Sequence, residues 1–394
     1  MAWRDALMRL PFFGRRLSAD AFAELVTREV TGRAPDLELR IIERLTLRVV
    51  AAETTEQRIH LDRAFEQYLE NPQELDEIVD RWASVIVGGT IQQKKLELAD
   101  VVPIVKARRW IDSQRAYHVE QFGTDKSFSL CWETYNAELI VAYAEFNSGL
   151  RFVRAEEVEA NGLDMAALRH LATKNLTDRT RELRIMGGGS DVVVICAEGN
   201  LEPSLILLDE VWRDPRATVD GNRLVTIAER GFAITAGAEN LRHIWQLAAD
   251  AAVSYRKALY AVSPHLFEQK GRMFELVDGG EDDESHAIPS PSNLDIHAVK
   301  RGGGSDLVII IATPLHADTR SVYRLFQKID NYLQFIAGDA YKKECGAPSK
   351  ESTRIIVRAH QETDPAILEL LGSVGDWVTS RNASLVIQAL DAIH

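Results

Sequence analysis

Two glycine runs are the part of the sequence whose residue types most suggest ligand chemistry. Residues Gly187–Asp191 read Gly-Gly-Gly-Ser-Asp, and the same five residues recur at Gly302–Asp306. A loop that cradles a phosphate places its glycines between a strand and a helix, so that the helix-terminal N–H groups point at the anion. Here a β-branched strand pattern follows each run, and no Gly-Lys-Ser or Gly-Lys-Thr is present. We therefore predict two hairpin turns that bind no cofactor, whose glycines supply the positive φ that such turns require.

The ten histidines and three cysteines form no metal or nucleophile motif. No two histidines have the spacing that would place both imidazoles on one helix face, and no Cys-x-x-Cys pair occurs. The Gly-x-Ser-x-Gly elbow of α/β-hydrolases is also missing from the sequence. From these patterns we predict no metal, no cofactor and no catalytic residue. Cys196 lies in an apolar run and is expected to be a buried thiol.

Two groups of residues are candidates for binding a partner. The N-terminal segment combines large apolar side chains with four arginines, which is typical of an arm that lies on a membrane surface or on another protein. The second group is basic and belongs to a predicted helix and the turn after it, where it could form a local positive patch for an acidic partner surface. The candidate partner-binding residues are Trp3, Leu7, Leu10, Phe12, Phe13, Arg169, Lys174 and Arg181. An arm folded back on its own domain and a solvated helix face are the alternatives for the same residues.

Composition narrows the class of partner. The chain of 394 residues carries 46 Lys and Arg against 59 Asp and Glu, which gives a formal net charge of −13. Broad, sequence-independent nucleic-acid binding needs a dominant positive surface, so no nucleic acid is expected as a partner. No apolar run approaches the roughly 20 residues that span a bilayer. We predict a cytoplasmic location, with at most peripheral membrane contact through the N-terminal arm.

The elements that must position these residues form several small domains. Residues 1–17 are the basic amphipathic arm, and residues 18–98 predict a helix capped by Ser18, a strand pair and two further helices. Residues 99–278 predict an α+β core of short strands and helices, with Pro103 at a sheet edge and a long helix from Glu239 to about Val262. Residues 279–293 contain two glycines, two prolines and four consecutive acids, which predicts a solvated linker.

The last part of the chain predicts a small domain with the order ββαβαβ over residues 294–394. A strand pair leads into a helix whose apolar residues recur at helical spacing from Val322 to Ile336. Phe326 and Ile329 lie on this apolar stripe and are expected to pack on the sheet. The predicted fold class is therefore α+β and multi-domain, with mixed or antiparallel sheets covered by helices.

Several local strings resemble the YtpQ-like family of uncharacterised bacterial proteins over residues 18–277. They are the helix 18–35 leading into 37–50, the strand 101–105, the string 168–176 and the hairpin 224–236 ahead of a long helix. Residues 294–390 are similar to a second small, uncharacterised bacterial domain, on the strings 294–299 and 325–338. The resemblance implies a bacterial α+β protein, and it implies no catalytic residue and no cofactor.

The sequence is compatible with two functions from different classes. We expect a cytoplasmic bacterial interaction or adaptor protein without catalytic activity, because two separable domains carry no assembled catalytic motif. The alternative is a hydrolase whose active-site residues converge only in the fold. A polar pocket with perturbed titratable groups favours the hydrolase, whereas apolar surface patches favour the adaptor.

Overall fold

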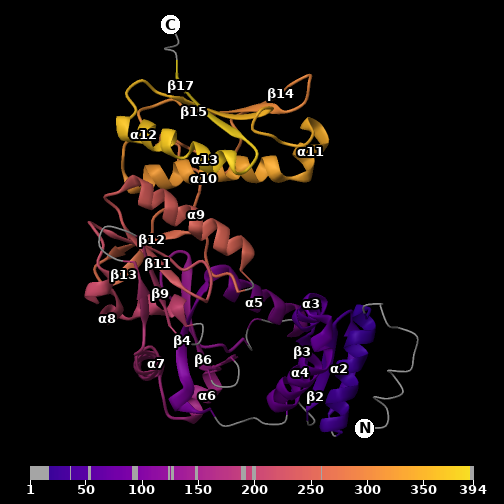
Figure 1. Ribbon diagram of the computed structural model, residues 1–394. Coiled ribbons are helices and arrows are strands. Elements are labelled where there is room, and N and C mark those ends of the chain that lie inside the picture. Colours follow the sequence, from indigo (N-terminus) through magenta and orange to yellow (C-terminus); the bar gives the residue numbers. More distant parts are fainter. Residues whose placement is uncertain are drawn as a thin grey trace. The chain divides into compact units, whose positions relative to one another are not determined.

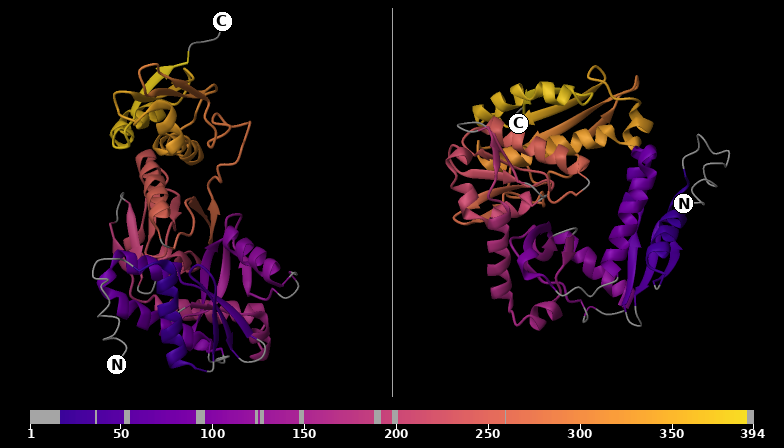
Figure 2. Two further views of the ribbon diagram at one scale, coloured as in Figure 1. Left: turned by 90° about the vertical axis from the view of Figure 1, so that its right-hand side faces the viewer. Right: turned by 60° about the horizontal axis from the view of Figure 1, so that its bottom comes forward.

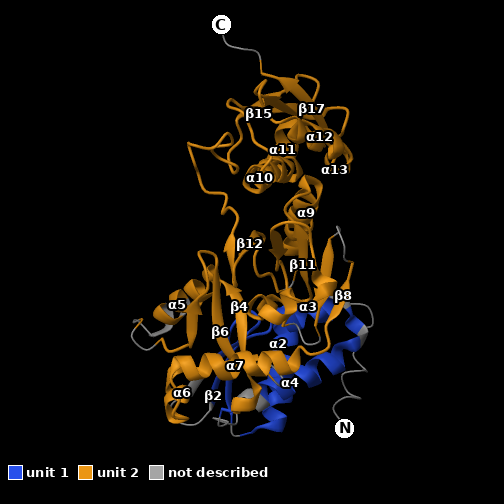
Figure 3. Ribbon diagram, turned by 90° about the vertical axis from the view of Figure 1, so that its left-hand side faces the viewer, with its two compact units in different colours: residues 1–96 blue, residues 97–394 orange. Residues whose placement is uncertain are grey.

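Residues Met1–Leu96 and Glu97–His394 form two separate units of the computed structural model (Figure 3). The structure describes residues 17–35, 37–51, 55–90, 96–122, 125, 128–146, 150–187, 192–197, 201–258 and 260–390. The predicted α+β class is confirmed, since antiparallel and mixed sheets alternate with helices along the chain. The predicted N-terminal arm, residues 1–17, lies outside the described residues except for Leu17.

The first unit packs helices against a three-stranded antiparallel sheet of order β1-β2-β3. Its elements are α2 (Ala19–Arg33), β1 (Glu38–Glu43), β2 (Thr46–Ala51), β3 (Thr55–His60), α3 (Asp62–Glu70), η1 (Pro72–Glu74) and α4 (Leu75–Thr90). Ser18 caps α2 as predicted, because its Oγ accepts a hydrogen bond from the Ala21 N–H at 3.2 Å. The rings of Phe22, Phe65 and Tyr68 contact one another in the core. The predicted strand pair is thus a three-stranded sheet.

The second unit begins with a four-stranded antiparallel sheet in which β4 lies at an edge. Its elements are η2 (Leu98–Asp100), β4 (Val101–Ala107), α5 (Arg108–Phe122), β5 (Trp132–Thr134), β6 (Leu139–Phe146), β7 (Leu150–Phe152), α6 (Ala155–Ala160) and α7 (Met165–Arg179). The edge position accommodates Pro103, which has no N–H to give to a second neighbouring strand. Asp164 caps α7, with its carboxylate accepting from the Ala167 N–H at 2.8 Å.

A six-stranded antiparallel sheet follows, with the order β13-β12-β10-β11-β9-β8. Its elements are β8 (Arg184–Met186), β9 (Val193–Cys196), η3 (Glu202–Leu207), α8 (Asp209–Trp212), η4 (Pro215–Ala217), β10 (Arg223–Thr226), β11 (Ala233–Gly237), α9 (Leu241–Lys257), β12 (Leu266–Lys270) and β13 (Met273–Leu276). Both predicted hairpins, β8–β9 and β10–β11, are present and antiparallel. The predicted long helix is shorter than expected at both ends, and the residues after Lys257 lead into β12.

The C-terminal sheet is mixed and has the order β14-β15-β16-β17. Its strands and helices are β14 (Ile296–Val299), β15 (Ser305–Ile311), α10 (Thr319–Ala337), α11 (Asp339–Cys345), β16 (Thr353–Ala359), α12 (Pro365–Ser373), α13 (Gly375–Thr379) and β17 (Ser384–Ala389). β14 is antiparallel to β15, and β15, β16 and β17 are parallel to one another. Parallel neighbours need crossover helices, which α10 to α13 supply, so the element order corresponds to the predicted ββαβαβ.

Helices α9 and α10 lie side by side and join two sheets of the second unit into one hydrophobic core (Figures 1 and 2). α9 covers the six-stranded sheet, and α10 packs beneath the C-terminal sheet. Phe326 on α10 is 3 % exposed, and its ring meets Trp245 of α9 at a centroid distance of 5.2 Å. Trp377 of α13 meets the same two rings. Phe326 therefore contacts the neighbouring helix α9, a contact that the sequence did not predict.

Residues 279–293, which we call the strap, lie against α10 and are not a solvated linker in the structure. The Arg324 guanidinium on α10 donates to the carbonyl oxygens of Glu281, Ile288 and Pro289, and Lys328 donates to those of Ser290 and Asn293. Ile288 is 2 % exposed and belongs to the shared core. The linker prediction was wrong because it rested on the side chains of this segment. The side chains of α10 instead bind the backbone carbonyl oxygens of the segment.

Asp278 anchors the beginning of the strap. Its carboxylate is 4 % exposed and forms an ion pair with Arg324 at 2.9 Å and with Arg320 at 2.7 Å. Burial opposes the charged form, but hydrogen bonds from Arg320, the Gly280 N–H and Arg324 outweigh it, so the pKa of Asp278 lies below its ordinary value. The carboxylate therefore stays charged inside the protein.

Candidate functional site

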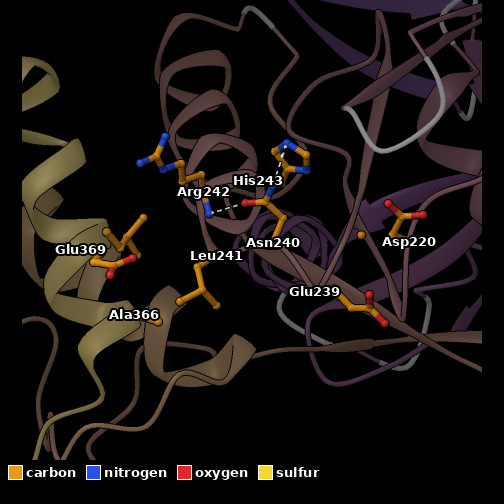
Figure 4. A pocket seen from close by; sticks show the side chains of 10 residues that line it. Asp220, Glu239, Asn240, Leu241, Arg242, His243, Ala366 and Glu369 are labelled. Atoms are coloured by element: carbon orange, nitrogen blue, oxygen red, sulfur yellow. Dashed lines mark hydrogen bonds between the residues drawn. The ribbon is translucent and has the colours of Figure 1, made fainter.

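A pocket of about 500 Å³ lies at the N-terminal end of α9 (Figure 4). We call it the α9 pocket. Its wall combines the segment before β10, the segment between β11 and α9, and one side of α12. The lining residues are Asp220, Gly237, Glu239, Asn240, Leu241, Arg242, His243, Ala366, Glu369 and Leu370. Figure 4 shows Glu369 and Arg242 toward one end and Asp220 and Glu239 toward the other.

Asn240 sets the beginning of α9 and so the floor of the pocket. Its side-chain oxygen accepts a hydrogen bond from the Arg242 N–H at 3.0 Å, which is an N-cap, and its Nδ2 lies 3.3 Å from Nε2 of His243. A side chain that caps a helix satisfies a backbone donor that has no partner within the helix. The imidazole of His243 is thereby held beside the first turn.

Two glycines allow Asp220 to approach β11. A Cβ atom on Gly237 would lie 1.9 Å from the backbone oxygen of Asp220, so only glycine fits at the end of β11. Gly221 has a φ of +73°, and a Cβ there would meet the side chain of Glu239 at 2.5 Å. The close approach brings the backbone of Asp220 against the end of β11, where Glu239 follows.

Charge in the α9 pocket is mainly negative. Asp220, Glu239 and Glu369 contribute three carboxylates from three separate segments, against the single guanidinium of Arg242. Leu241, Ala366 and Leu370 add apolar surface between them. Such a lining suits an organic cation with an aliphatic stem, because the stem can contact the apolar surface while its charged head meets a carboxylate.

Metal binding finds no support among the described residues, where no three His, Cys, Asp or Glu side chains are close enough to hold an ion. The described cysteines are unpaired thiols. Burial, with the charges of Glu156 and Glu157, raises the pKa of Cys131 to about 11, and burial also raises the pKa of Cys345. Cys196 is half-buried, so the expected buried thiol is partly accessible.

Two of the three predicted basic residues form ion pairs with carboxylates. Arg169 pairs with Glu133, and Arg181 pairs with Asp178 at 2.5 Å. Lys174 is exposed on the same helix. None of the three lines the α9 pocket, and Trp3, Leu7, Leu10, Phe12 and Phe13 lie outside the described residues.

The string 168–176, which carried much of the family resemblance, has a structural role in this chain. Leu168, Ala172 and Leu176 are fully buried on the face of α7 that packs on β4. Asn175 donates from Nδ2 to the carbonyl oxygens of Leu98 and Val101, both at 2.8 Å. These residues position β4 and contribute no group to the pocket.

The glycine runs connect antiparallel strands, as predicted. Gly303 and Gly304 have φ values of +90° and +78° in the turn between β14 and β15. Gly187 has a φ of +89° at the end of β8, and residues 188–191 lie outside the described residues. The turn prediction is thus confirmed for the second run, and the positive φ of Gly187 is compatible with a turn at the first.

Sequence reasoning missed the α9 pocket because its residues are far apart in the chain. Asn240 ahead of an amphipathic helix signals a cap, and Gly221 and Gly237 signal tight backbone contacts, but no spacing connects them to Glu369. The approach of α12 to α9 brings Glu369 to the pocket.

In the part of the chain that the structure describes, no helix is both long and apolar enough to cross a membrane. The chain was also compared with models of protein families, with curated proteins and with solved structures. None of the three comparisons gives a match. The resemblance to YtpQ-like proteins therefore stays a prediction.

Proposed function

We propose that this chain is a non-catalytic interaction protein whose α9 pocket receives a basic segment of a partner protein. The observation that carries the proposal is that three carboxylates, those of Asp220, Glu239 and Glu369, line one pocket. Complementary charge across an interface speeds association and selects among partners. A lysine or arginine side chain is the group of opposite charge that a partner protein can offer.

The shape and lining of the pocket support the same choice. A volume of about 500 Å³ is in the range of pockets that hold small ligands, and it accommodates one or two long side chains. The aliphatic stem of a lysine would lie on the apolar surface of Leu241 and Ala366, with its ammonium at one of the pocket's carboxylates. The overall charge of −13 adds a long-range attraction for a basic partner.

The sequence-based expectations of origin and location belong to this proposal. We propose a bacterial cytoplasmic protein, similar to the YtpQ-like family, that takes a protein partner and no nucleic acid. The hydrolase is the alternative, and the same experiment distinguishes it by looking for cleavage.

Calorimetric titration of the full chain with two synthetic peptides of equal length tests the proposal. One peptide carries three consecutive lysines, and the other carries glutamates in their place. We expect saturable binding of the lysine peptide alone, weaker at about 300 mM than at about 50 mM salt because salt screens exposed charges. Glu369→Gln and Asp220→Asn should each weaken binding by about two- to fivefold. The matched control Glu344→Gln, an exposed change on α11, should leave binding unchanged.

Three results would count against the proposal. Equal affinity for both peptides would show that charge does not select the ligand. Equal weakening by Glu344→Gln would place the effect outside the pocket. Peptide fragments in the mass spectrum of the titrated sample would favour the hydrolase over a non-catalytic role.

A further inference from the structure

β17 forms one edge of the C-terminal sheet (Figure 1). The strand reads Ser-Leu-Val-Ile-Gln-Ala, and no ionisable side chain occurs from Asn382 to Leu390. Ile387 is 38 % exposed, and Leu385 and Val386 are half-buried. Uncharged, β-branched segments of this kind are typical of strands that have a neighbour on both sides. β17 therefore has the composition of an interior strand at an edge position.

Edge strands of proteins commonly carry charged side chains, because a charge opposes pairing with the strand of another chain. The other described edge strands follow this rule. β14 is followed directly by Lys300 and Arg301. The strands β1, β3, β4, β5, β7, β8 and β13 each contain Glu, Lys or Arg. Among the edge strands that the structure describes, β17 alone lacks this protection.

The backbone of β17 has donors and acceptors on its outer side. The N–H of Leu390, directly after the strand, donates to the Ala359 carbonyl of β16 at 2.7 Å. Successive N–H groups of a strand point to opposite sides, so that of Val386 also points to β16, and those of Leu385 and Ile387 point away from it. No described residue bonds to the backbone groups of Leu385 and Ile387 on that side. A further strand could bond to them without displacing β17.

The side chains of β17 alternate between the two faces of the sheet. Leu385 and Ile387 lie on the face that the helices cover, and Ser384, Val386 and Gln388 lie on the opposite face. An antiparallel pair of two such strands, centred on Val386, places that residue opposite its counterpart. Leu385 then lies opposite Ile387 of the second strand, and Ser384 lies opposite Gln388. The strand is its own complement, because apolar residues meet apolar ones and polar residues meet polar ones.

We propose that β17 pairs antiparallel with β17 of a second copy of this chain, so that two C-terminal sheets join into one continuous sheet. A two-fold axis perpendicular to the sheet, at Val386, would relate the two copies. On each side of this axis, Leu385 would exchange both backbone hydrogen bonds with Ile387 of the second copy. The outer side of β17 would then be paired along its length.

Charge favours a second copy over a strand of a charged partner. The chain has a formal net charge of −13, so two copies repel each other wherever their acidic surfaces meet. β17 contributes no charge to this repulsion, and Arg358 is exposed beside it on β16, opposite Gln388 in the register. A charged strand would gain no counter-charge from β17 itself. No residue of β17 lines the α9 pocket, so the inference is independent of the proposed function.

Sedimentation velocity of the full chain over about 1–300 µM tests the pairing. A single strand pair is smaller than a standard protein interface, so we expect a monomer–dimer equilibrium whose dimer fraction rises with concentration. Ile387→Lys places two like charges near the two-fold axis and should weaken the dimer about tenfold. Met273→Lys, a similarly exposed change on the edge strand β13, is the matched control and should leave the dimer unchanged. Both variants should unfold at the temperature of the parent in dilute solution, which shows that the fold is intact.

Cysteine cross-linking tests the register. Opposite residues of a non-hydrogen-bonded antiparallel pair have Cα atoms about 4.5 Å apart, which a disulfide can span. Mild oxidation should therefore link two chains that carry Val386→Cys. Ile387→Cys should link far less, because its counterpart lies two positions further along the second strand. The parent chain under the same oxidation controls for its own cysteines.

Several outcomes would overturn the proposal. A chain that stays monomeric up to about 300 µM would leave the edge to a strand of another protein or to none. A dimer that Ile387→Lys and Met273→Lys weaken equally, or that neither weakens, would have its interface elsewhere. Val386→Cys chains that cross-link no more than the parent would exclude the antiparallel pair centred on that residue.

Discussion

Arg324 lies in the middle of α10 with 1 % of its side chain exposed, yet it is fully paired. Its Nε donates to the Ile288 carbonyl, Nη1 donates to the Asp278 carboxylate and the Glu281 carbonyl, and Nη2 donates to the carbonyls of Ile288 and Pro289. A buried charge is tolerated when its hydrogen bonds are complete. Residue Arg324 therefore holds the strap and the charge of Asp278 together.

Replacement of Arg324 tests this role. Arg324→Met should lower the free energy of unfolding by about 3–5 kcal/mol, because it leaves the Asp278 carboxylate buried beside a single remaining arginine. The comparison is Arg320→Met, whose side chain is 44 % exposed and whose loss should cost less than that of Arg324, because Arg324 still pairs with Asp278. Urea unfolding of the full chain measures both. Equal effects of the two changes would contradict the assignment of Arg324 as the anchor.

At the scale of elements, the turn between β14 and β15 shows how closely a short segment can be specified. The Gly303 N–H donates to the Lys300 carbonyl at 3.0 Å, and the Gly304 N–H donates to the Cys345 carbonyl at 2.7 Å. A Cβ on Gly304 would lie 2.3 Å from the backbone oxygen of Ser352, whereas a Cβ on Gly302 would meet nothing within 4 Å. The three glycines are therefore not equivalent.

Alanine at each of the three positions should separate these roles. Gly302→Ala should be close to neutral, and Gly303→Ala should cost about 1 kcal/mol because its φ is positive. Gly304→Ala should cost more than Gly303→Ala, since a backbone clash adds to the strain of φ. Urea midpoints of the three variants give the order. An identical loss at all three positions would show that the turn tolerates rearrangement.

Elements with a strong apolar period were predictable, and polar ones were not. α10 follows from the apolar stripe from Val322 to Ile336. β3 reads Thr-Glu-Gln-Arg-Ile-His, with one apolar residue, so no pattern marks it. α5 was missed for a similar reason, because Ile111 is its one residue in the buried core among those described.

Tertiary contacts explain why the candidate sites escaped sequence analysis. Arg324 and Arg354 look alike in the sequence, although the first is enclosed and the second is exposed on the sheet. Lys106 likewise lies at the end of an apolar strand, and nothing in the sequence marks its burial. The spacing of apolar residues along the chain predicts which face of a helix or strand is buried. It does not predict which helices and strands pack against one another.

At the scale of the whole molecule, the second unit extends across the place where the sequence indicated a boundary. α9 and α10 share a core through Trp245 and Phe326, and the strap is bound along α10. The separation between the two units follows Leu96, two residues before the expected boundary after residue 98. One hydrophobic core can therefore include elements from before and after the strap, although the strap itself is acidic.

Limited proteolysis with a glutamate-specific protease tests this continuity. Glu281 and Glu284 lie in the strap, and a solvated linker would be cut there first. We expect these two sites to resist cleavage until the second unit unfolds, because the Glu281 carbonyl and its neighbours are bound to Arg324. Mass spectrometry of early fragments identifies the sites. Rapid cutting after Glu281 or Glu284 in the native protein would restore the linker interpretation.

The hydrogen bonds of the strap also say what kind of change it can absorb over evolutionary time. Arg324, Lys328 and Asn331 bind carbonyl oxygens, which every amino acid carries. Substitutions at solvent-facing positions such as Asp282 and Glu284 leave those oxygens in place, so the amino-acid sequence of the strap can change. A deletion of one residue moves every later oxygen out of register with α10. Among descendants of this chain, the length of the strap should persist where its composition does not.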